Sequence, residues 1–312
     1  MGYIGEIISL GVAFLWTVTA LVSDLAVKQL GVFVSNVWRM LAAMILSGVL
    51  MWIFCGDFWP VYANSEAWIW LLISGVVGYF FGDWCLFNSY IWIGPRYGQL
   101  FMTLAPLSSA IAAYFTLSEP LSWKSILAMI VTLIGISISI LGKGDDKKIK
   151  LQLPLKGILF GIGAGVGQGI GIVLSKIGMN YYTEGVPSDV LPDIQNYLAF
   201  SSNQIRCIAG FICFTIWLLL RGEFPKLKES YKNHKGMLMV GLAVIFGPFL
   251  GVGFSLMAVN YVEAGIASTL MALTPVIIIL PSRLIYKEKI TFKTIFGAIV
   301  AVLGASLFFL LK

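Results

Sequence analysis

Long apolar stretches and short polar breaks alternate along the whole chain. Ten of the apolar stretches are each about as long as the 20 residues that an α-helix needs to cross the hydrocarbon core of a bilayer. The breaks between them contain glycine, proline or charged residues. The pattern predicts an all-α integral membrane protein with ten transmembrane helices. The predicted helices are Ile4–Val22, Val32–Phe54, Ala67–Ile93, Gly98–Leu117, Trp123–Leu141, Leu155–Ile177, Leu198–Leu220, Gly236–Asn260, Gly265–Ile285 and Phe292–Leu311.

The two halves of the chain repeat one another. A shift of 169 residues places Pro106 of a Leu-Ala-Pro sequence on Pro275 of a Leu-Thr-Pro sequence. No gap is needed from the third predicted helix of each half to the fifth. The same shift pairs Gly78 with Gly247, Phe80 with Phe249, Gly82 with Gly251, Glu119 with Glu288, Gly135 with Gly304 and Ser137 with Ser306.

Two earlier blocks of the repeat align at other shifts. A Ser-Asn-x-x-Arg motif ending at Arg39 matches the same motif ending at Arg206, at a shift of 167, and the first helices align at 152. The change in shift places an insertion of about 15 residues in the loop Asn180–Tyr197. We infer two five-helix repeats, residues 1–142 and 155–312, joined by a linker at 143–154.

The number of helices in each repeat bears on mechanism. Because five is odd, the second copy enters the membrane from the side opposite to the first. Inverted repeats are a common architecture of secondary transporters, whose substrate site lies near the midplane where the copies meet. The pattern therefore predicts a transporter that works by alternating access between two nearly equivalent packings.

Composition agrees with a membrane protein. Hydrophobic residues make up 59% of the chain and charged residues 12%, whereas a soluble domain has about half and a quarter. The formal net charge is +6, but the basic residues lie in short loops between apolar stretches, where they orient membrane helices. We therefore expect the lipid bilayer as a partner and no nucleic acid. The four cysteines show neither C-x-x-C nor metal-ligand spacing and are expected to be free thiols.

Motifs for other chemistry do not occur in the sequence. There is no Walker A motif, no H-E-x-x-H and no G-x-S-x-G, and the single histidine, His234, falls in a predicted loop. We expect no enzymatic activity, no cofactor and no metal site. Two other membrane classes stay open at this stage. A channel would pass ionic current, and a non-transporting scaffold or sensor would move no solute.

Several positions of the repeat together form a family pattern. They are Trp16 in the first helix, Arg39 at the start of the second, Pro106 and Pro275, Glu119 and Glu288, and Gly135 and Gly304. In these residues, and over nearly its whole length, the chain resembles the EamA-type ten-helix transporters of the drug/metabolite transporter superfamily. The resemblance implies export of amino acids, related metabolites or amphipathic compounds, with uptake also represented. It further implies a bacterial inner membrane and a monomer or weak homodimer.

Two indications of membrane orientation disagree. The family resemblance implies that both termini lie in the cytoplasm. The basic loops Lys143–Lys156, Arg221–Lys235 and Lys287–Lys293 would then all lie outside. Because lysine and arginine are enriched in cytoplasmic loops, the charge count favours both termini outside.

Asp83 is the main candidate for a role in transport. It lies near the middle of the third predicted helix, and an ionisable group at membrane depth by default marks a substrate or proton pathway. Helical spacing places Tyr79, Phe87 and Tyr90 on the same face, which would surround the acid with aromatic rings. This arrangement favours a proton or another coupling ion, or a solute that carries an amine. The alternative is a structural pair with a donor on a neighbouring helix.

Polar positions on the first helix of each repeat form a second candidate set. Trp16, Thr19 and Ser23 share one face, and the repeat places Gln168 and Ser175 at the positions of Trp16 and Ser23. These residues are expected to line a site between the copies, or else to pack helices together through small and hydroxyl side chains. Weaker candidates of the same kind are Asn203, Gln204 and Asn260.

The remaining candidates are assigned structural or gating roles at helix ends. We expect the side chains of Arg39 and Arg206 to reach toward the lipid headgroups, since both residues open a helix. Glu119 and Glu288 border loops and are expected to cap a helix or pair with a basic residue. The sixth predicted helix contains glycine at 157, 161, 163, 165, 167, 169 and 171, which allows close packing and predicts bending during transport.

Overall fold

A computed structural model describes residues 3–141, 154–277, 281 and 291–310, and these residues form helices and turns with no β-strand. The helices of the first half are α1 (Ile4–Leu30), α2 (Val32–Cys55), α3 (Ser65–Ser74), α4 (Trp84–Phe101), α5 (Leu104–Thr116) and α6 (Trp123–Leu141), with a π-helical segment η1 (Gly75–Asp83) joining α3 to α4. Those of the second half are α7 (Leu155–Gly185), α8 (Leu191–Ile194), α9 (Leu198–Leu220), α10 (Phe224–Ser230), α11 (His234–Val244), η2 (Ile245–Phe249, also π-helical), α12 (Leu250–Tyr261), α13 (Ala264–Met271), α14 (Thr274–Ile277) and α16 (Phe292–Leu310).

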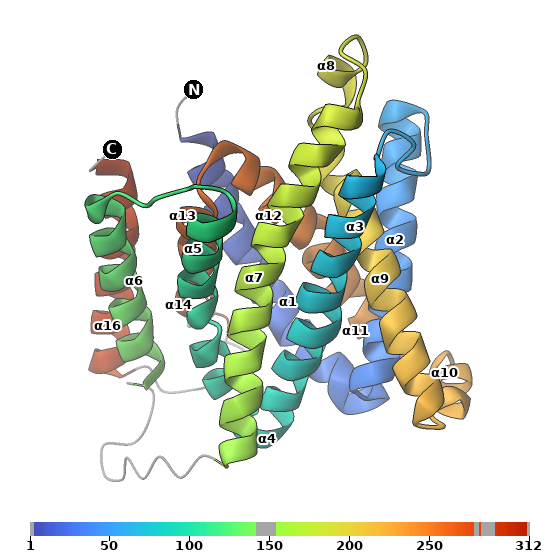
Figure 1. Ribbon diagram of the computed structural model, residues 1–312. Helices are drawn as coiled ribbons and strands as arrows, with labels where there is room; N and C mark the ends of the chain where they lie inside the picture. The colour runs from blue at the N-terminus through green and yellow to red at the C-terminus, as the bar shows by residue number, and fades with distance from the viewer. Residues whose placement is uncertain (1–2, 142–153, 278–280, 282–290, 311–312) are drawn as a thin grey trace.

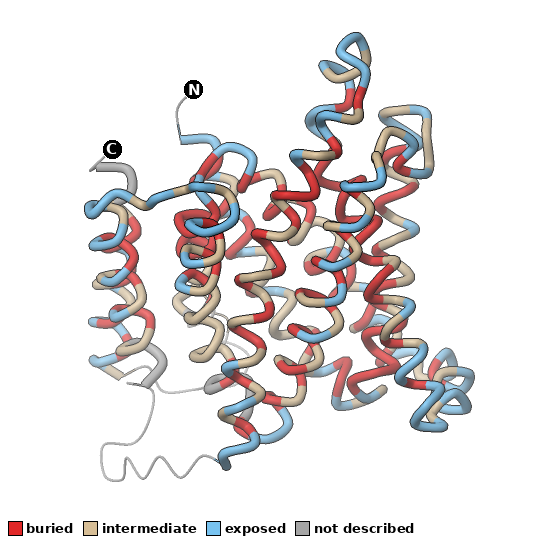
Figure 2. The backbone as a smooth tube through the Cα atoms, in the orientation of Figure 1, coloured by how far each residue is buried: buried red, intermediate tan, exposed pale blue. Residues whose placement is uncertain are grey.

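Many of these helices carry apolar side chains on their outer surfaces. Within the described part of the chain, six helical stretches are long and apolar enough to cross a membrane. Large apolar side chains face outward, including Phe14, Trp52 and Leu220, which are 60–76% exposed. Figure 2 shows the buried positions on the helix sides that meet inside the bundle. Such a surface requires lipid as its solvent, so the chain is a multi-pass membrane protein. The six stretches are Ile4–Leu30, Val32–Cys55, Ser65–Ile93, Leu155–Gly185, Leu198–Leu220 and His234–Tyr261.

The hydrophobic pattern predicts several helix bounds well and others poorly. The bounds of α6 and α9 are those predicted from the sequence. The prediction that a helix begins at Gly98 is wrong, because α4 continues to Phe101 and α5 begins only at Leu104. The predicted helix Gly265–Ile285 is interrupted after α13, and much of its second part lies outside the described residues.

The two halves are interleaved rather than side by side. α1, the first helix of the first half, packs against α11 and α12 of the second half, and α7 packs against α3, η1 and α4 of the first. Equivalent helices also pair across the halves: α2 with α9, α5 with α13, and α6 with α16. In Figure 1, α1 begins at the end of the bundle where α16 ends, whereas α7 begins at the opposite end. Each half therefore completes the packing of the other.

A π-helical segment recurs at the same place in each half. The shift of 169 residues carries Tyr79 in the middle of η1 onto Pro248 in η2. π-Helical turns widen the backbone locally and occur frequently at functional sites. Both segments face the interior between the halves, because Gly78 of η1 lies against α7 and Gly247 of η2 lies against Thr19 of α1.

Candidate functional site

Two adjoining cavities lie where the halves meet. Their volumes are about 60 and 100 Å³, and Trp16, Gln99, Gln168 and Thr274 are among the residues that line both. Trp16 comes from α1, Gln99 from α4 and Gln168 from α7, so both halves supply the walls. This position matches the general location of substrate sites in transporters built from repeats.

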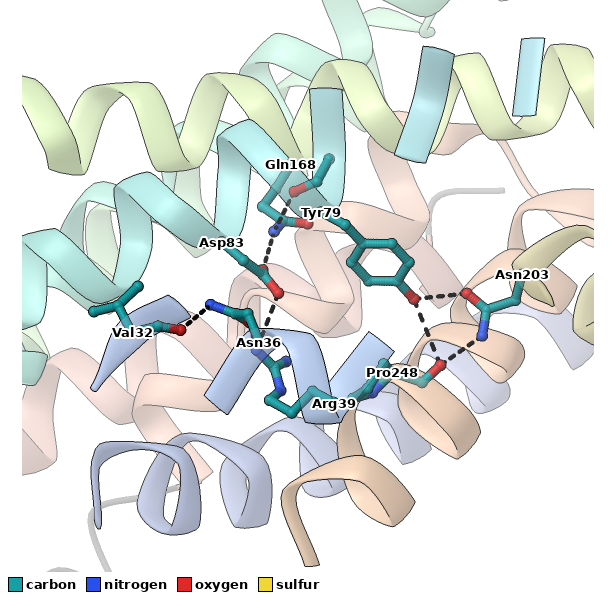
Figure 3. Close-up of polar contacts among 9 residues, drawn as sticks. Val32, Asn36, Arg39, Tyr79, Asp83, Gln168, Asn203 and Pro248 are labelled. Atoms are coloured by element: carbon teal, nitrogen blue, oxygen red, sulfur yellow. Dashed lines mark hydrogen bonds and ion pairs between the residues drawn. The ribbon is translucent and has the colours of Figure 1, made fainter. Parts of the chain in front are cut away.

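Asp83 is held at the wall of the larger cavity by a buried hydrogen-bond network (Figure 3). Its Oδ2 accepts from Nη1 of Arg39 at 3.1 Å, and its Oδ1 accepts from Nε2 of Gln168 at 2.8 Å. Nη1 of Arg39 also donates to Oδ1 of Asn36 at 2.6 Å, and Gln168 donates to the carbonyl of Gly78 at 3.1 Å. The Arg39 and Asp83 side chains are only 6% and 8% exposed. The network thus connects α2, η1 and α7 through one buried ion pair.

A second polar cluster lies beside the first (Figure 3). The hydroxyl of Tyr79 donates to Oδ1 of Asn203 at 2.6 Å, and Nδ2 of Asn203 donates to the carbonyl of Pro248 at 2.5 Å. Nε of Arg206 donates to Oγ of Ser74 at 2.9 Å, and the Arg206 guanidinium lies 4.6 Å from the centroid of the Tyr79 ring. This cluster connects α3, η1, α9 and η2.

The two clusters are related by the internal repeat, but their charges differ. Asn36 and Arg39 of the first correspond to Asn203 and Arg206 of the second. The first arginine has the carboxylate of Asp83 as its partner, whereas the position equivalent to Asp83 holds Val252. Each repeat therefore places an asparagine and an arginine at the interface, but only the first repeat supplies an acid beside them.

The expectation that Arg39 and Arg206 reach toward the headgroups is wrong. The two residues are 5% and 4% exposed, and both border the cavities. They lie about two helical turns inside α2 and α9, and the helical phase directs them into the bundle. Arginine at that depth is stabilised by internal partners, which here are Asp83 for Arg39 and Ser74 with Tyr79 for Arg206.

Most of the other predicted site residues meet at the larger cavity. Its walls include Trp16, Thr19, Ser23, Tyr79, Asp83, Phe87, Tyr90 and Gln168.

Three candidates lie elsewhere. Ser175 is fully buried between helices, where its hydroxyl pairs with that of Ser74 at 2.6 Å. Gln204 donates to the carbonyl of Phe58 at 3.0 Å, and Asn260 is exposed. The buried contact of Ser175 corresponds to helix packing, the alternative to lining a site between the copies.

Several residues that line the cavities were not found from the sequence. The sequence prediction placed Gln99 and Met102 at the start of a new helix, after a break at residues 94–97. Gln99 instead lies in α4, and Met102 follows it directly. Thr274 had a usable signal, because it precedes Pro275 in the repeated Leu-x-Pro sequence. Its hydroxyl bonds to the carbonyls of Met271 at 2.9 Å and Ala13 at 3.3 Å, which ties the start of α14 to α1.

Among the helix-end candidates, Glu119 makes contacts between the two repeats. Oε1 of Glu119 pairs with Nζ of Lys176 at 2.5 Å, and its Oε2 accepts from the backbone N–H of Ala264, which begins α13, at 3.2 Å. Pro106 is buried in α5, and the backbone of Pro275 lies in α14. Glu288 lies outside the described residues. Glu119 therefore joins the first repeat to two helices of the second.

Removal of this contact should weaken the packing of the repeats. We expect Glu119→Ala to lower the free energy of unfolding by about 1–2 kcal/mol, because a part-buried ion pair and a helix cap are both lost. Denaturant unfolding of the detergent-solubilised protein measures this change. Glu184→Ala, at an exposed position near the end of α7, is the control and should stay within about 0.5 kcal/mol of the wild type. Equal stability of the Glu119 variant and the control would contradict the assigned contact.

The fold and the cavities between two similar halves are typical of a membrane transporter. A sequence model of the EamA-like transporter family matches the chain twice, over residues 3–141 and 155–310. The chain belongs to the EamA-like transporter family.

Solved structures add information on the fold. One crystal structure is 16% identical to this chain, covers 98% of it and 96% of its own length, and superposes with a TM-score of 0.69. At that identity the likeness concerns the fold alone. A comparison with curated proteins found no match.

Proposed function

We propose that this protein is a secondary transporter that moves small metabolites across a bacterial inner membrane by alternating access. The observation that carries the proposal is the cavity between the halves, whose wall holds the buried Arg39–Asp83 ion pair. A charged pair inside a membrane protein is costly to bury, and it is typical of substrate and ion pathways. The cargo is an amino acid or a related amphipathic or amine-bearing compound, and the direction is export.

Ten transmembrane helices in two inverted five-helix repeats are part of the proposal. Six strongly apolar stretches, the shorter apolar helices α6 and α16, and the opposite starting ends of α1 and α7 support it. The pairing of α2 with α9 and of α5 with α13 is the contact pattern that a pseudo-two-fold axis in the membrane plane produces. A single chain then contains both halves of the site, which is consistent with a functional monomer.

The coupling step follows from the arrangement around Asp83. A proton that binds to its carboxylate would remove the charge that Arg39 requires, and the network between α2, η1 and α7 would loosen. Two packings of the same helices could then exchange as the proton arrives and leaves. In this scheme Asp83 is the proton-binding residue, and Arg39 transmits its charge state to α2.

Flux measurements in liposomes test the proposed function. We expect purified protein in liposomes to transport members of a panel of amino acids and amines with saturation and with counterflow. An imposed pH gradient should accelerate the net flux, because a proton moves with or against the cargo. Ionic current without saturation would identify a channel, and no movement of any panel member would favour a scaffold or sensor. Protein-free liposomes provide the background leak.

A further inference from the structure

The charges at the cavities do not balance. Among the described residues that line the cavities, the charged side chains are Arg39, Asp83 and Arg206. Both carboxylate oxygens of Asp83 already accept hydrogen bonds, one from Arg39 and one from Gln168. One buried positive charge is left over, and it belongs to Arg206.

Arg206 is only partly satisfied by the protein. Its Nε donates to Ser74 at 2.9 Å, and its guanidinium stacks at 4.6 Å from the ring centroid of Tyr79. Within the described part of the chain, no hydrogen bond or ion pair forms at its Nη1 or Nη2. The residue is 4% exposed, and it lines the smaller cavity. A guanidinium with two free donor groups, buried against an interior cavity, is suited to a planar anionic partner.

The rest of the smaller cavity has the character of a binding pocket for a small organic acid. The hydroxyl of Ser268 and the second amide hydrogen of Gln99 can donate to a ligand there. The hydroxyls of Ser255 and Thr274 donate to backbone carbonyls and can accept from a ligand amine. The apolar side chains of Trp16, Ile172, Val252 and Met271 also line the cavity. A carboxylate with a hydrocarbon tail requires a lining that contains both kinds of group.

We propose that Arg206 binds the carboxylate of the transported solute, so that the cargo is a carboxylate-bearing metabolite, with or without an amine. The inference rests on the proposed transport function and narrows its substrate class. A carboxylate would form two parallel hydrogen bonds to Nη1 and Nη2 and neutralise the surplus charge. A solute whose only charge is an ammonium would meet a net positive site, since Arg39 already neutralises Asp83. Val252, at the position equivalent to Asp83, leaves Arg206 free for this purpose.

Binding measurements on the full-length protein in detergent test the substrate class. The probes form two matched series: leucine, 4-methylpentanoate, its methyl ester and 3-methylbutylamine, and phenylalanine, 3-phenylpropionate, its methyl ester and phenethylamine. Titration calorimetry gives the affinities, and the rise in unfolding temperature with ligand gives an independent readout. We expect at least one probe with a free carboxylate to bind the wild type and to bind at least about 30-fold more tightly than its ester or amine.

Variants then assign the effect to Arg206. Arg206→Gln should weaken carboxylate binding about 30-fold or more, while Arg206→Lys, which keeps the charge, should lose less. Arg221→Gln on the exposed end of the same helix is the control and should bind as the wild type does. If Arg206→Gln does not fold, the comparison of acid, ester and amine on the wild type decides the question.

Three results would overturn the inference: no binding of any carboxylate probe, equal binding of acid and ester or amine, or unchanged carboxylate binding by a folded Arg206→Gln variant. These results leave the proposed function standing if the liposomes still show saturable flux of amines. Absence of all flux, together with carboxylate binding, would contradict transport and retain the site.

Discussion

The Asp83→Asn variant is expected to lose about 3–5 kcal/mol of unfolding free energy and most of the response of transport to a pH gradient. The substitution keeps the shape of the side chain but leaves Arg39 as a buried cation without its counter-ion. The amide can still accept a hydrogen bond from Arg39 or from Gln168, so the loss comes mainly from the charge. Denaturant unfolding in one detergent measures the first effect, and liposome flux measures the second.

A double variant separates the loss of the ion pair from other effects of the substitution. Asp83→Asn combined with Arg39→Gln removes both charges, and we expect it to be more stable than Asp83→Asn alone, because no unpaired charge stays buried. Glu223→Gln is the control. It removes a part-buried acid that pairs with the exposed Arg221 and Lys226 at 3.7 and 3.3 Å, and it should change stability by less than about 1 kcal/mol. Similar losses for Asp83→Asn and the control would rule out a stabilising role for the pair.

The outcome for transport distinguishes two roles of Asp83. Flux that continues but no longer responds to the pH gradient would assign the proton to this carboxylate. Flux that responds to pH as in the wild type would restrict Asp83 to holding Arg39 and Gln168 in place, which is the structural alternative of the sequence analysis.

The fold was predictable where hydrophobicity alone determines structure. Helices α6 and α9 have the bounds that their apolar lengths predict, because lipid sets the length of a crossing helix. Glycine and polar residues around Gly98 resembled a loop, yet helix α4 runs through them to Phe101. Hydrogen bonding within the bundle maintains helical backbone that an exposed segment of the same sequence would abandon. The π-helical segments have no signature in hydropathy, since they change the backbone and not the residue pattern.

The candidate site was predictable in position but not in its pairings. Helical spacing brought Tyr79, Asp83, Phe87 and Tyr90 to one face, and all four line the larger cavity. The partner of Asp83 lies 44 residues away in the sequence. Only the packing of α2 against α4, and of α9 against both α2 and η1, brings Arg39 to it. Both arginines lie near the start of a helix, which suggested that their side chains reach the lipid headgroups. Sequence alone does not show which side of a helix faces protein.

The glycines of α7 lead to the second large expected effect. One close backbone contact lies between α7 and η1, where a Cβ atom on Gly171 would meet the Cα of Gly78 at 2.8 Å and its backbone nitrogen at 3.1 Å. Backbone cannot rotate away as a side chain can, so Gly171→Ala would push η1 and α7 apart. We expect a loss of about 1–3 kcal/mol in unfolding free energy, in the range of other overpacked sites.

A matched control isolates the contact from helix propensity. Gly241, in the interior of α11, is exposed, and a Cβ there would meet nothing within 4 Å. Gly241→Ala should therefore leave stability unchanged or raise it by up to about 1 kcal/mol, which is the preference of helices for alanine over glycine. The two substitutions are chemically identical, so a difference in sign between them reports the packing at Gly171.

The same substitution also discriminates between two interpretations of the glycine-rich helix. The structure shows α7 as one continuous helix from Leu155 to Gly185, with Gly171 in contact with η1. Separation of these segments would lengthen the bond from Gln168 to Asp83 and weaken the proton-binding network, so flux should fall together with stability. If Gly171→Ala is as stable as the wild type but transports poorly, bending of α7 is the required property, because alanine stiffens a helix without disturbing its contacts. If stability falls and flux persists, close packing at this point is structural and lies outside the transport cycle.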